Sequence, residues 1–339
     1  MHIEDILLDQ KSKNNLEELA DIIRNNPHEA IAFVGAGISK PLGLGLWEDF
    51  LGRVCFASGN EKTCREIEDI KDGLQKEGKI GSLPEVASTL LPDSKYKEKD
   101  ISAFIEKAIN MRDINYTPIH KKIIDIFRII VTTNYDFAFK FAVDEKKRYR
   151  LTEQRRINEI KTSFALFLNG VNDRHVVYLH GCAGDTCLLR EEEYNKYYIT
   201  DNTLGELVRV IIKNHVVCYF GFGFRDIYYL NLIQEIKDIQ EKRDQSFARC
   251  DSIKENKYRH YAFVDEESIK KEVAYKVKGK DGKDEEQKVM MSEYLDKLYI
   301  KPIIKKKNSG WYVTEDLLEY LERISLKPDE KYKKGEYDE

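Results

Sequence analysis

Four short motifs combine glycine with polar side chains, and each follows a run of apolar residues. The first motif is a loop of small residues, Gly35, Ala36, Gly37, Ile38 and Ser39. Glycine lets a backbone approach a ligand closely, and the start of a following helix presents N–H groups to a phosphate. The lysine of a nucleoside-triphosphate loop is missing, and Lys40 stands where a dinucleotide fingerprint has its third glycine. A tight turn without a ligand is the alternative for this motif.

The second motif, Thr133, Asn134, Tyr135 and Asp136, follows the apolar run 129–133. An amide at this place could position a ribose hydroxyl, a carboxamide or a water molecule. The alternative is that Asn134 or Asp136 caps the helix that follows, since both side chains are common helix caps. Of the two residues, we expect Asp136 rather than Asn134 to form such a cap.

The third motif is His180-Gly181, which follows the apolar run 175–179. Histidine titrates near neutral pH, so it can take a proton from a hydroxyl group or from water. A lone histidine is more often structural, and we assign that role to five others, at positions 28, 120, 175, 215 and 260. His180 differs from them by its place beside the other motifs.

The fourth motif contains Gly221, Gly223, Arg225 and Asp226 and follows the run 216–221. Its glycines permit a second close approach of the backbone to a ligand. Arg225 could reach a phosphate or simply be solvated, and Asp226 could simply cap the next helix. Four ligand-competent turns at one edge of a sheet are nevertheless hard to explain by packing alone.

The elements that must position these motifs alternate between strands and helices. The runs 30–35, 129–133, 175–179 and 216–221 are short, continuous and rich in β-branched or aromatic residues, which is typical of parallel strands buried on both faces. Further strands are expected at 260–264 and 298–304, and Pro302 favours an edge position for the latter. The pattern predicts an α/β fold, a Rossmann-like doubly wound parallel sheet, with a helical insertion at about 47–122 between the first two strands.

Composition narrows the class of protein. The chain has 339 residues, 42% of them hydrophobic and 34% charged, with a net charge of −4. The mixed charges give no whole-chain reason to expect nucleic-acid binding. There is neither an apolar run of about eighteen residues nor a signal-peptide pattern, so we expect a cytoplasmic protein without a membrane span. Its six scattered cysteines predict reduced thiols. Residues 277–288 are expected to form a charged, exposed loop or hairpin, and 326–339 a disordered tail.

Taken together, the motifs resemble the sirtuin (SIR2) superfamily, and more closely the sirtuin-like NAD hydrolases of bacterial antiphage defence. The glycine loop, Asn134, Asp136 and His180-Gly181 match the superfamily in the same order, with Thr133 where sirtuins usually carry Gln. The defence enzymes add a Gly and Trp segment, here 43–49 with Trp47, and a Gly-x-x-x-x-Asp element, here Gly221 to Asp226. The resemblance covers about 15–325, which we expect to form one catalytic domain.

Two departures from the family pattern affect these expectations. Protein deacetylases of the superfamily carry two Cys-x-x-Cys pairs that bind zinc, whereas Cys182 and Cys187 are five residues apart and no second pair follows. We therefore expect no zinc. Gly223 replaces the usual serine of the fourth motif, which leaves contacts to the adenosine side of the ligand to the backbone.

The resemblance implies NAD as the substrate, and nicotinamide and ADP-ribose as the products. It implies that the glycine loop binds the diphosphate and that Asn134 and His180 are catalytic residues, with His180 as general base. It also implies NAD contacts for Trp47, Thr133, Asp136, Gly221, Gly223 and Asp226. The alternatives are a deacetylase or ADP-ribosyltransferase, and a non-catalytic NAD or ADP-ribose sensor.

Regulation is expected because an unrestrained NAD hydrolase would harm its own cell. The resemblance implies a homo-oligomer, or a protein partner such as an ATPase or a nucleic-acid-sensing subunit. The stretch 47–122 is the candidate control element, with a rigid wall of the pocket as the alternative. A lid over the pocket would gate both substrate and water.

Overall fold

A parallel sheet of seven strands forms the centre of the protein. The computed structural model describes residues 3–59, 64–76, 82–110, 115–146, 149–157, 172–247, 260–278, 284–306 and 312–325. The strand order is β3-β4-β2-β1-β5-β6-β9, and every neighbouring pair is parallel. The strands are β1 (Ala30–Val34), β2 (Ile129–Thr132), β3 (Arg150–Gln154), β4 (Asp173–Tyr178), β5 (Val216–Phe220), β6 (His260–Asp265) and β9 (Ile300–Lys305). The predicted α/β fold with a parallel sheet is confirmed.

The two edge strands illustrate what a sequence pattern can detect. β9 lies at one edge, as Pro302 predicted, and pairs only with β6 among the described strands. β3 lies at the other edge and was not predicted, because its sequence RLTEQ contains no apolar run. An edge strand buries less of its surface than a central strand, so polar residues are tolerated there.

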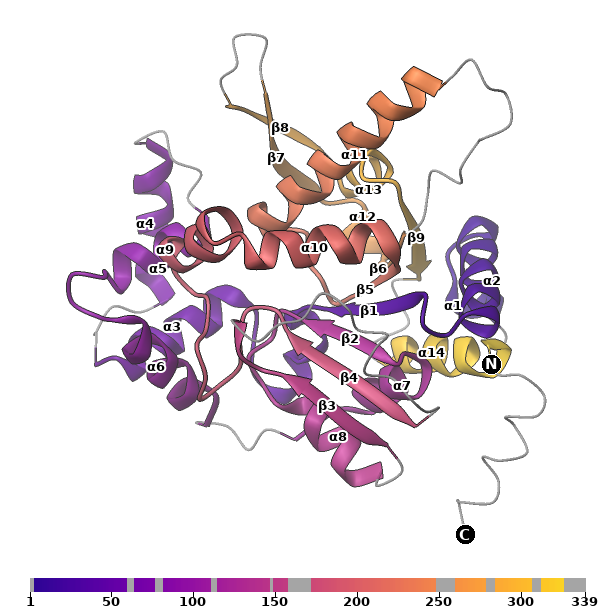
Figure 1. Cartoon of the computed structure of the whole chain (residues 1–339), viewed down its shortest axis with the longest axis horizontal. Helices are drawn as coiled ribbons and strands as arrows, with labels where there is room; N and C mark the ends of the chain where they lie inside the picture. Colours follow the sequence, from indigo (N-terminus) through magenta and orange to yellow (C-terminus); the bar gives the residue numbers. More distant parts are fainter. Residues whose placement is uncertain are drawn as a thin grey trace.

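Helices cover both faces of the sheet, and the side chains of β1 show how the core divides. Ile31 and Phe33 pack on one face, and Ala30, Ala32 and Val34 pack on the other, as the period of two in a strand requires. The first face is covered mainly by α10 (Thr203–Asn214), α11 (Ile227–Phe247) and α13 (Met291–Lys297) (Figure 1). The second is covered by α2 (Gln10–Asn25), α7 (Pro118–Ile126), α8 (Ala138–Lys146) and α14 (Tyr312–Ser325).

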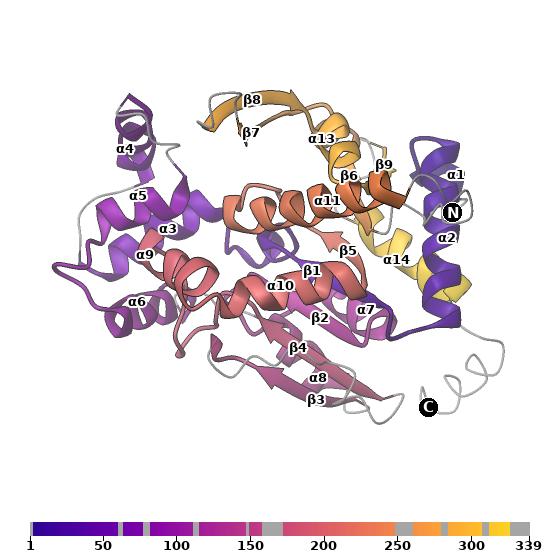
Figure 2. The same cartoon turned by 45° about the horizontal axis from the view of Figure 1, so that its top comes forward.

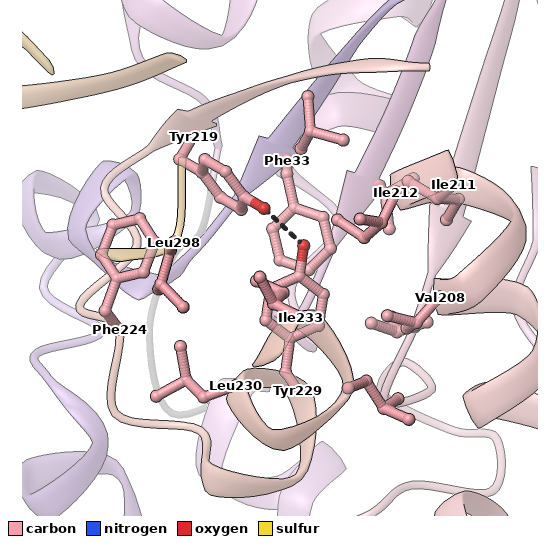
Figure 3. Packing of buried hydrophobic residues seen from close by; sticks show 14 of the residues in the cluster. Phe33, Val208, Ile211, Ile212, Tyr219, Phe224, Tyr229, Leu230, Ile233 and Leu298 are labelled. Carbon is pink, nitrogen blue, oxygen red and sulfur yellow. Dashed lines mark hydrogen bonds between the residues drawn. The ribbon is translucent and has the colours of Figure 1, made fainter. Parts of the chain in front are cut away.

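Aromatic residues fill the first face below the carboxyl end of β5. Figure 3 shows Phe33, Tyr219 and Tyr229 packed together there, with Ile233 from α11 beside them. The Tyr219 and Tyr229 hydroxyls lie 2.9 Å apart and form a hydrogen bond inside this core. Buried tyrosines usually satisfy their hydroxyl groups in this way.

The chain begins to pack ahead of the expected domain start at residue 15. The short helix α1 (Ile3–Ile6) buries Ile3 and Ile6 in the same core as α2 and α14. The Leu8 N–H donates to the Ile304 carbonyl, and the Lys306 N–H donates to the Ile6 carbonyl. This segment therefore supports the edge strand β9.

Helices between β1 and β2 form a third hydrophobic core. It contains residues of α3 (Trp47–Ala57), α4 (Cys64–Lys76), α5 (Leu83–Leu90) and α6 (Glu98–Asn110). α7 belongs instead to the layer on the sheet, where it packs against α8 and α14. Figure 2 shows the helices α3 to α6 at one end of the sheet, and α7 continues the helical segment between β1 and β2 as far as Ile126.

The last part of the chain adds a two-stranded antiparallel sheet. β7 (Glu272–Lys278) pairs with β8 (Asp284–Met290), so the charged stretch 277–288 falls largely on these strands, and residues 279–283 lie outside the described part. Figure 1 shows the pair projecting beside α11. The predicted tail, 326–339, also lies outside the described residues. Within the described ranges, no helix combines the length and apolar character needed to cross a membrane.

Candidate active site

Two glycine loops at the carboxyl edge of the sheet touch each other through their backbones. The Gly37 N–H donates to the Gly221 carbonyl oxygen at 3.0 Å. A Cβ at Gly35 or Gly37 would lie 2.7 or 2.8 Å from that oxygen, and a Cβ at Gly221 would lie 2.6 Å from the Ile38 nitrogen. Gly221 also has a positive φ of 58°, which glycine adopts without strain. These glycines are therefore required by the contact between the loops, whatever ligand lies above them.

The first glycine loop does not open an α-helix, contrary to the helix start expected from its sequence. It continues into two 3₁₀ turns, Ala36–Ile38 and Lys40–Leu42. The Gly37 N–H is already bonded to Gly221. Fewer backbone N–H groups are thus available to a phosphate than at the start of an α-helix.

Ser39, Asn134 and Asp136 form a buried hydrogen-bond network beneath this loop. The Asn134 amide donates from Nδ2 to Ser39 Oγ at 3.0 Å and to the Gly35 carbonyl at 3.3 Å. The Ser39 hydroxyl in turn donates to Asp136 Oδ2 at 2.8 Å. The second motif therefore holds the first loop in place through side chains that are far apart in the sequence.

Asp136 also caps a helix, in addition to accepting the bond from Ser39. Its Oδ1 accepts the Ala138 N–H at 3.0 Å, at the start of α8. Burial raises the pKa of this carboxyl group, while the bonds from Ala138 and Ser39 lower it. The Asn134 side chain makes its bonds to the loop instead.

His180 follows β4 and is almost fully buried among aromatic side chains. Its Nε2 lies 3.1 Å from the Tyr198 hydroxyl and 3.3 Å from Asp226 Oδ2, and its Nδ1 lies 3.2 Å from the Tyr194 hydroxyl. Both tyrosine rings meet the imidazole edge to face. We refer to His180, Tyr194, Tyr198 and Asp226 as the histidine–tyrosine cluster.

Asp226 caps a helix and also contacts His180. Its Oδ1 accepts the N–H groups of Tyr228 and Tyr229 at 3.0 and 3.1 Å, at the start of α11. Its Oδ2 points to His180 Nε2. The helix cap, the more favoured sequence interpretation, and the place in the candidate site are therefore both correct descriptions of this residue.

The tyrosines of the cluster were not predicted from the sequence. Tyr194 lies on α9 (Glu191–Asn195), and Tyr198 lies on the π-helical turn η5 (Lys196–Thr200). The spacing of four residues places both rings on one side, where they stack with centroids 5.8 Å apart. The tyrosine-rich sequence around 194–198 was the available signal, but nothing local to it indicates contact with His180.

Arg190 fixes α9 against the helical insertion. It is fully buried, and its Nη1 donates to the Leu91 and Tyr96 carbonyls at 3.1 and 2.9 Å. The guanidinium also forms an ion pair with the Glu193 carboxylate, and its Nε donates a hydrogen bond to Glu193 Oε1 at 2.8 Å. Burial raises the pKa of Glu193, and the bonds from Arg190 oppose that shift. The segment that carries the tyrosines is therefore anchored by a desolvated ion pair.

A cleft of about 1610 Å³ opens above these groups. Its lining includes most of the residues singled out in the sequence, namely Gly35, Ala36, Gly37, Ile38, Trp47, Thr133, His180, Gly221, Gly223 and Asp226. Ser39, Asn134 and Asp136 are not part of the lining and lie buried behind the loop. The helical insertion forms one wall through Trp47 and the start of α5.

Gly223 differs from the other glycines of the site. A Cβ there would approach nothing closer than 3.9 Å, and its nearest neighbour is the Arg225 side chain. A serine would therefore fit at this position, so packing does not account for the departure from the family pattern.

Cys182 and Cys187 are buried beside His180-Gly181 as free thiols. Burial raises the pKa of both thiols, so neither is poised as a thiolate. Within the described part of the chain, no three His, Cys, Asp or Glu side chains are grouped as metal ligands.

Comparisons with known proteins agree with this arrangement. Residues 128–288 match the family model of the SIR2-like domain, a range that contains the second, third and fourth motifs and begins after the first glycine loop. Over this range the chain is similar to SIR2-like domains, and the range includes strands β3, β4, β5 and β6 of the parallel sheet. It is also 23% identical over 244 residues to Defense-associated sirtuin 2 of Bacillus subtilis, a match that covers 70% of this chain and 22% of that protein. The predicted resemblance to a SIR2-type defence family is confirmed.

Proposed function

We propose that the protein is an NAD glycohydrolase, which cleaves the bond between nicotinamide and ribose and passes the ADP-ribosyl group to water. One observation carries the proposal. The glycine loops, Thr133 and His180 come from separate segments and line a single cleft at the carboxyl edge of the sheet. Ligands of open α/β sheets bind at this edge.

The chemistry makes modest demands on the protein. Nicotinamide leaves as a neutral group from a cationic one, so its departure through an oxocarbenium-like state needs no strong acid. The site must hold the diphosphate, orient the ribose and admit one water molecule in a productive position. We assign the diphosphate to the Gly35–Ser39 loop and the ribose face to Thr133, with Trp47 and Gly221 in the cleft wall.

The two proposed catalytic residues have different surroundings. His180 faces the cleft through the histidine–tyrosine cluster and supplies the base. Asn134 lies behind the glycine loop, with its Nδ2 bonded to Ser39 and the Gly35 carbonyl. Its contribution in this arrangement is to position the loop and, through the loop, the substrate.

A role in antiphage defence, with depletion of NAD, follows from the same proposal. The relative's name refers to defence, and this chain matches only 22% of its length. We propose that the isolated chain is weakly active, and that assembly into an oligomer, or a partner such as an ATPase or nucleic-acid-sensing subunit, switches the activity on. The helical insertion, which forms one wall of the cleft, is the proposed control element.

The direct test is to incubate the purified chain with NAD, alone and with the products of neighbouring genes, and to follow nicotinamide release. Wild type is expected to release nicotinamide and ADP-ribose in equal amounts. His180→Ala is expected to lose about 10²–10⁴ in rate, as for removal of one positioned base. Melting curves show whether the variant remains folded.

The same assay separates the alternatives. Turnover that requires an acetylated peptide or a protein acceptor would identify a transferase. Tight NAD binding without nicotinamide release under every condition would identify a sensor. Elemental analysis is expected to find no stoichiometric zinc, and one tightly bound zinc per chain would favour the deacetylase.

A further inference from the structure

His180 has no nitrogen directed at open space in the cleft. Nδ1 faces the Tyr194 hydroxyl at 3.2 Å, and Nε2 faces both the Tyr198 hydroxyl at 3.1 Å and Asp226 Oδ2 at 3.3 Å. The whole side chain is only 2% exposed. A water molecule that gives up a proton to this imidazole must therefore pass it through a neighbouring group.

Asp226 determines which nitrogen carries the hydrogen of the neutral ring. Its Oδ1 already accepts two backbone N–H groups, whereas its buried Oδ2 has no hydrogen-bond partner among the described residues and lies 3.3 Å from His180 Nε2. A carboxylate only accepts hydrogen bonds, and leaving it unsatisfied in a buried site is costly. The hydrogen therefore belongs on Nε2, and Nδ1 is left as an acceptor.

With Nδ1 as an acceptor, the Tyr194 hydroxyl is the donor. Tyr198 cannot take this role, because its hydroxyl lies beside the nitrogen that carries the hydrogen. Tyr194 lines the cleft, and Arg190 holds its helix in place through the pair with Glu193 and the Tyr194 N–H bond to the Arg190 carbonyl.

We propose that Tyr194, His180 and Asp226 form a proton relay, in which the Tyr194 hydroxyl is the group that contacts the attacking water. This inference rests on the proposed NAD cleavage and names the atom that acts as base. As the water oxygen bonds to the ribose carbon, its O–H bond breaks and the proton moves to the Tyr194 oxygen. The original Tyr194 proton moves to His180 Nδ1, and Asp226 stabilises the resulting imidazolium. The order of groups parallels a Ser-His-Asp triad, but the two ring nitrogens are exchanged and the hydroxyl passes a proton instead of attacking the substrate.

The surroundings of Tyr194 suit a relay better than a free phenolate. Burial raises the pKa of its hydroxyl, and the charge of Asp226 adds to the shift. The tyrosine thus keeps its proton at rest and releases it only as it receives another.

The first experiment needs no substrate. NMR of protein labelled with ¹⁵N-histidine reports the tautomer of each ring, and comparison with His180→Gln identifies His180 among the seven histidines. The relay requires the Nε2–H tautomer with Nδ1 as acceptor, and Tyr194→Phe should shift the Nδ1 resonance. An Nδ1–H tautomer would overturn the relay, even if the protein cleaves NAD.

The second experiment measures nicotinamide release in variants that each lack a single tyrosine hydroxyl group. Tyr194→Phe is expected to lower kcat by about 10²-fold with little change in KM, because a proton-transfer group is lost while the ring remains. In mixtures of H₂O and D₂O, the rate of wild type should show two protons in transit, and any residual rate of the variant should not.

The matched control is Tyr229→Phe, which removes a buried hydroxyl bonded to Tyr219 in the adjacent core. Its kcat should stay within about 2-fold of wild type once folding is verified. Unchanged kcat in Tyr194→Phe, or an equal loss in Tyr198→Phe, would contradict the relay. If wild type itself releases no nicotinamide, the proposed function fails, and the tautomer measurement still decides the relay.

Discussion

The two ends of the central strands carry histidines in contrasting surroundings. His28, His175, His215 and His260 lie close to the amino ends of β1, β4, β5 and β6, whereas His180 follows the carboxyl end of β4. Among these five, His180 is the one that lines the cleft. Residue type alone therefore does not distinguish a candidate base from a structural histidine.

The partners of these histidines account for the difference. At the amino edge, His260 Nδ1 accepts the Val217 N–H at 3.2 Å, and His28 Nε2 lies 3.0 Å from the Arg128 guanidinium. At the carboxyl edge, His180 meets a carboxylate and two phenols. A carboxylate favours the imidazolium that forms during base catalysis, and an arginine disfavours it.

The ion pair that anchors the carboxyl-edge cluster offers the largest expected effect. Arg190→Met leaves the Glu193 carboxylate buried without its partner, which should lower the free energy of unfolding by about 3–5 kcal/mol. Urea unfolding measures this change. Arg190→Met with Glu193→Leu should recover much of the loss, because no unpaired charge remains. A loss below about 1 kcal/mol in the single variant would mean that the pair does not anchor α9.

The second prediction concerns the rate of NAD cleavage, and compares the substitution of a buried polar residue at the carboxyl edge of the sheet with one at the amino edge. Asn134→Ala frees the Gly35–Ser39 loop from its amide donor and should lower NAD cleavage by about 10²-fold, because misplacing substrate by an ångström has effects of this size. The control is His175→Gln at the amino edge, whose kcat per folded molecule should match wild type. Equal losses in the two variants would remove the functional distinction between the edges.

The third prediction concerns the glycine contact at the carboxyl edge. Gly37→Ala places a Cβ 2.8 Å from the Gly221 carbonyl oxygen. Both atoms belong to backbone, so relief requires the loops to separate, at about 1–3 kcal/mol in the free energy of unfolding. Gly223→Ala is the control and should change stability by less than about 0.5 kcal/mol, since the space there is open. Thermal or urea unfolding distinguishes the two.

The smallest expected effect is the change of the free energy of unfolding with pH that is caused by His175 at the amino edge. Burial lowers the pKa of His175 to about 4, from an ordinary value of 6.5. As pH falls below 6.5, the unfolded chain takes up a proton that the folded protein does not, so stability present above that pH is lost. The slope is about 1.4 kcal/mol per pH unit down to the folded pKa. Between pH 6 and 5, the free energy of unfolding measured with urea should fall more steeply for wild type than for His175→Gln, by this amount. Parallel pH dependences in the two proteins would contradict a buried, neutral His175.

The motifs predicted which segments meet, but not every role within the site. Continuous apolar runs identified the strands, and the rule that ligands bind at carboxyl ends brought Thr133, His180 and Asp226 to one edge. The glycines at 35, 37 and 221 were correctly placed there, yet their local pattern could not show that they contact each other. Tyr194 and Tyr198 were missed because their function depends on contact with His180 from another segment.

The sequence by itself determined the α/β fold and the convergence of its motifs, because periodicity and strand order follow from local burial and the geometry of parallel sheets. The tertiary structure alone decided that Asn134 holds a loop, that the Asp226 side chain which caps α11 also lies against His180 Nε2, and that Tyr194 lies at Nδ1. These contacts join different segments of the chain, and their geometry depends on how α9 and α11 pack on the sheet. No pattern within a single segment encodes such distances.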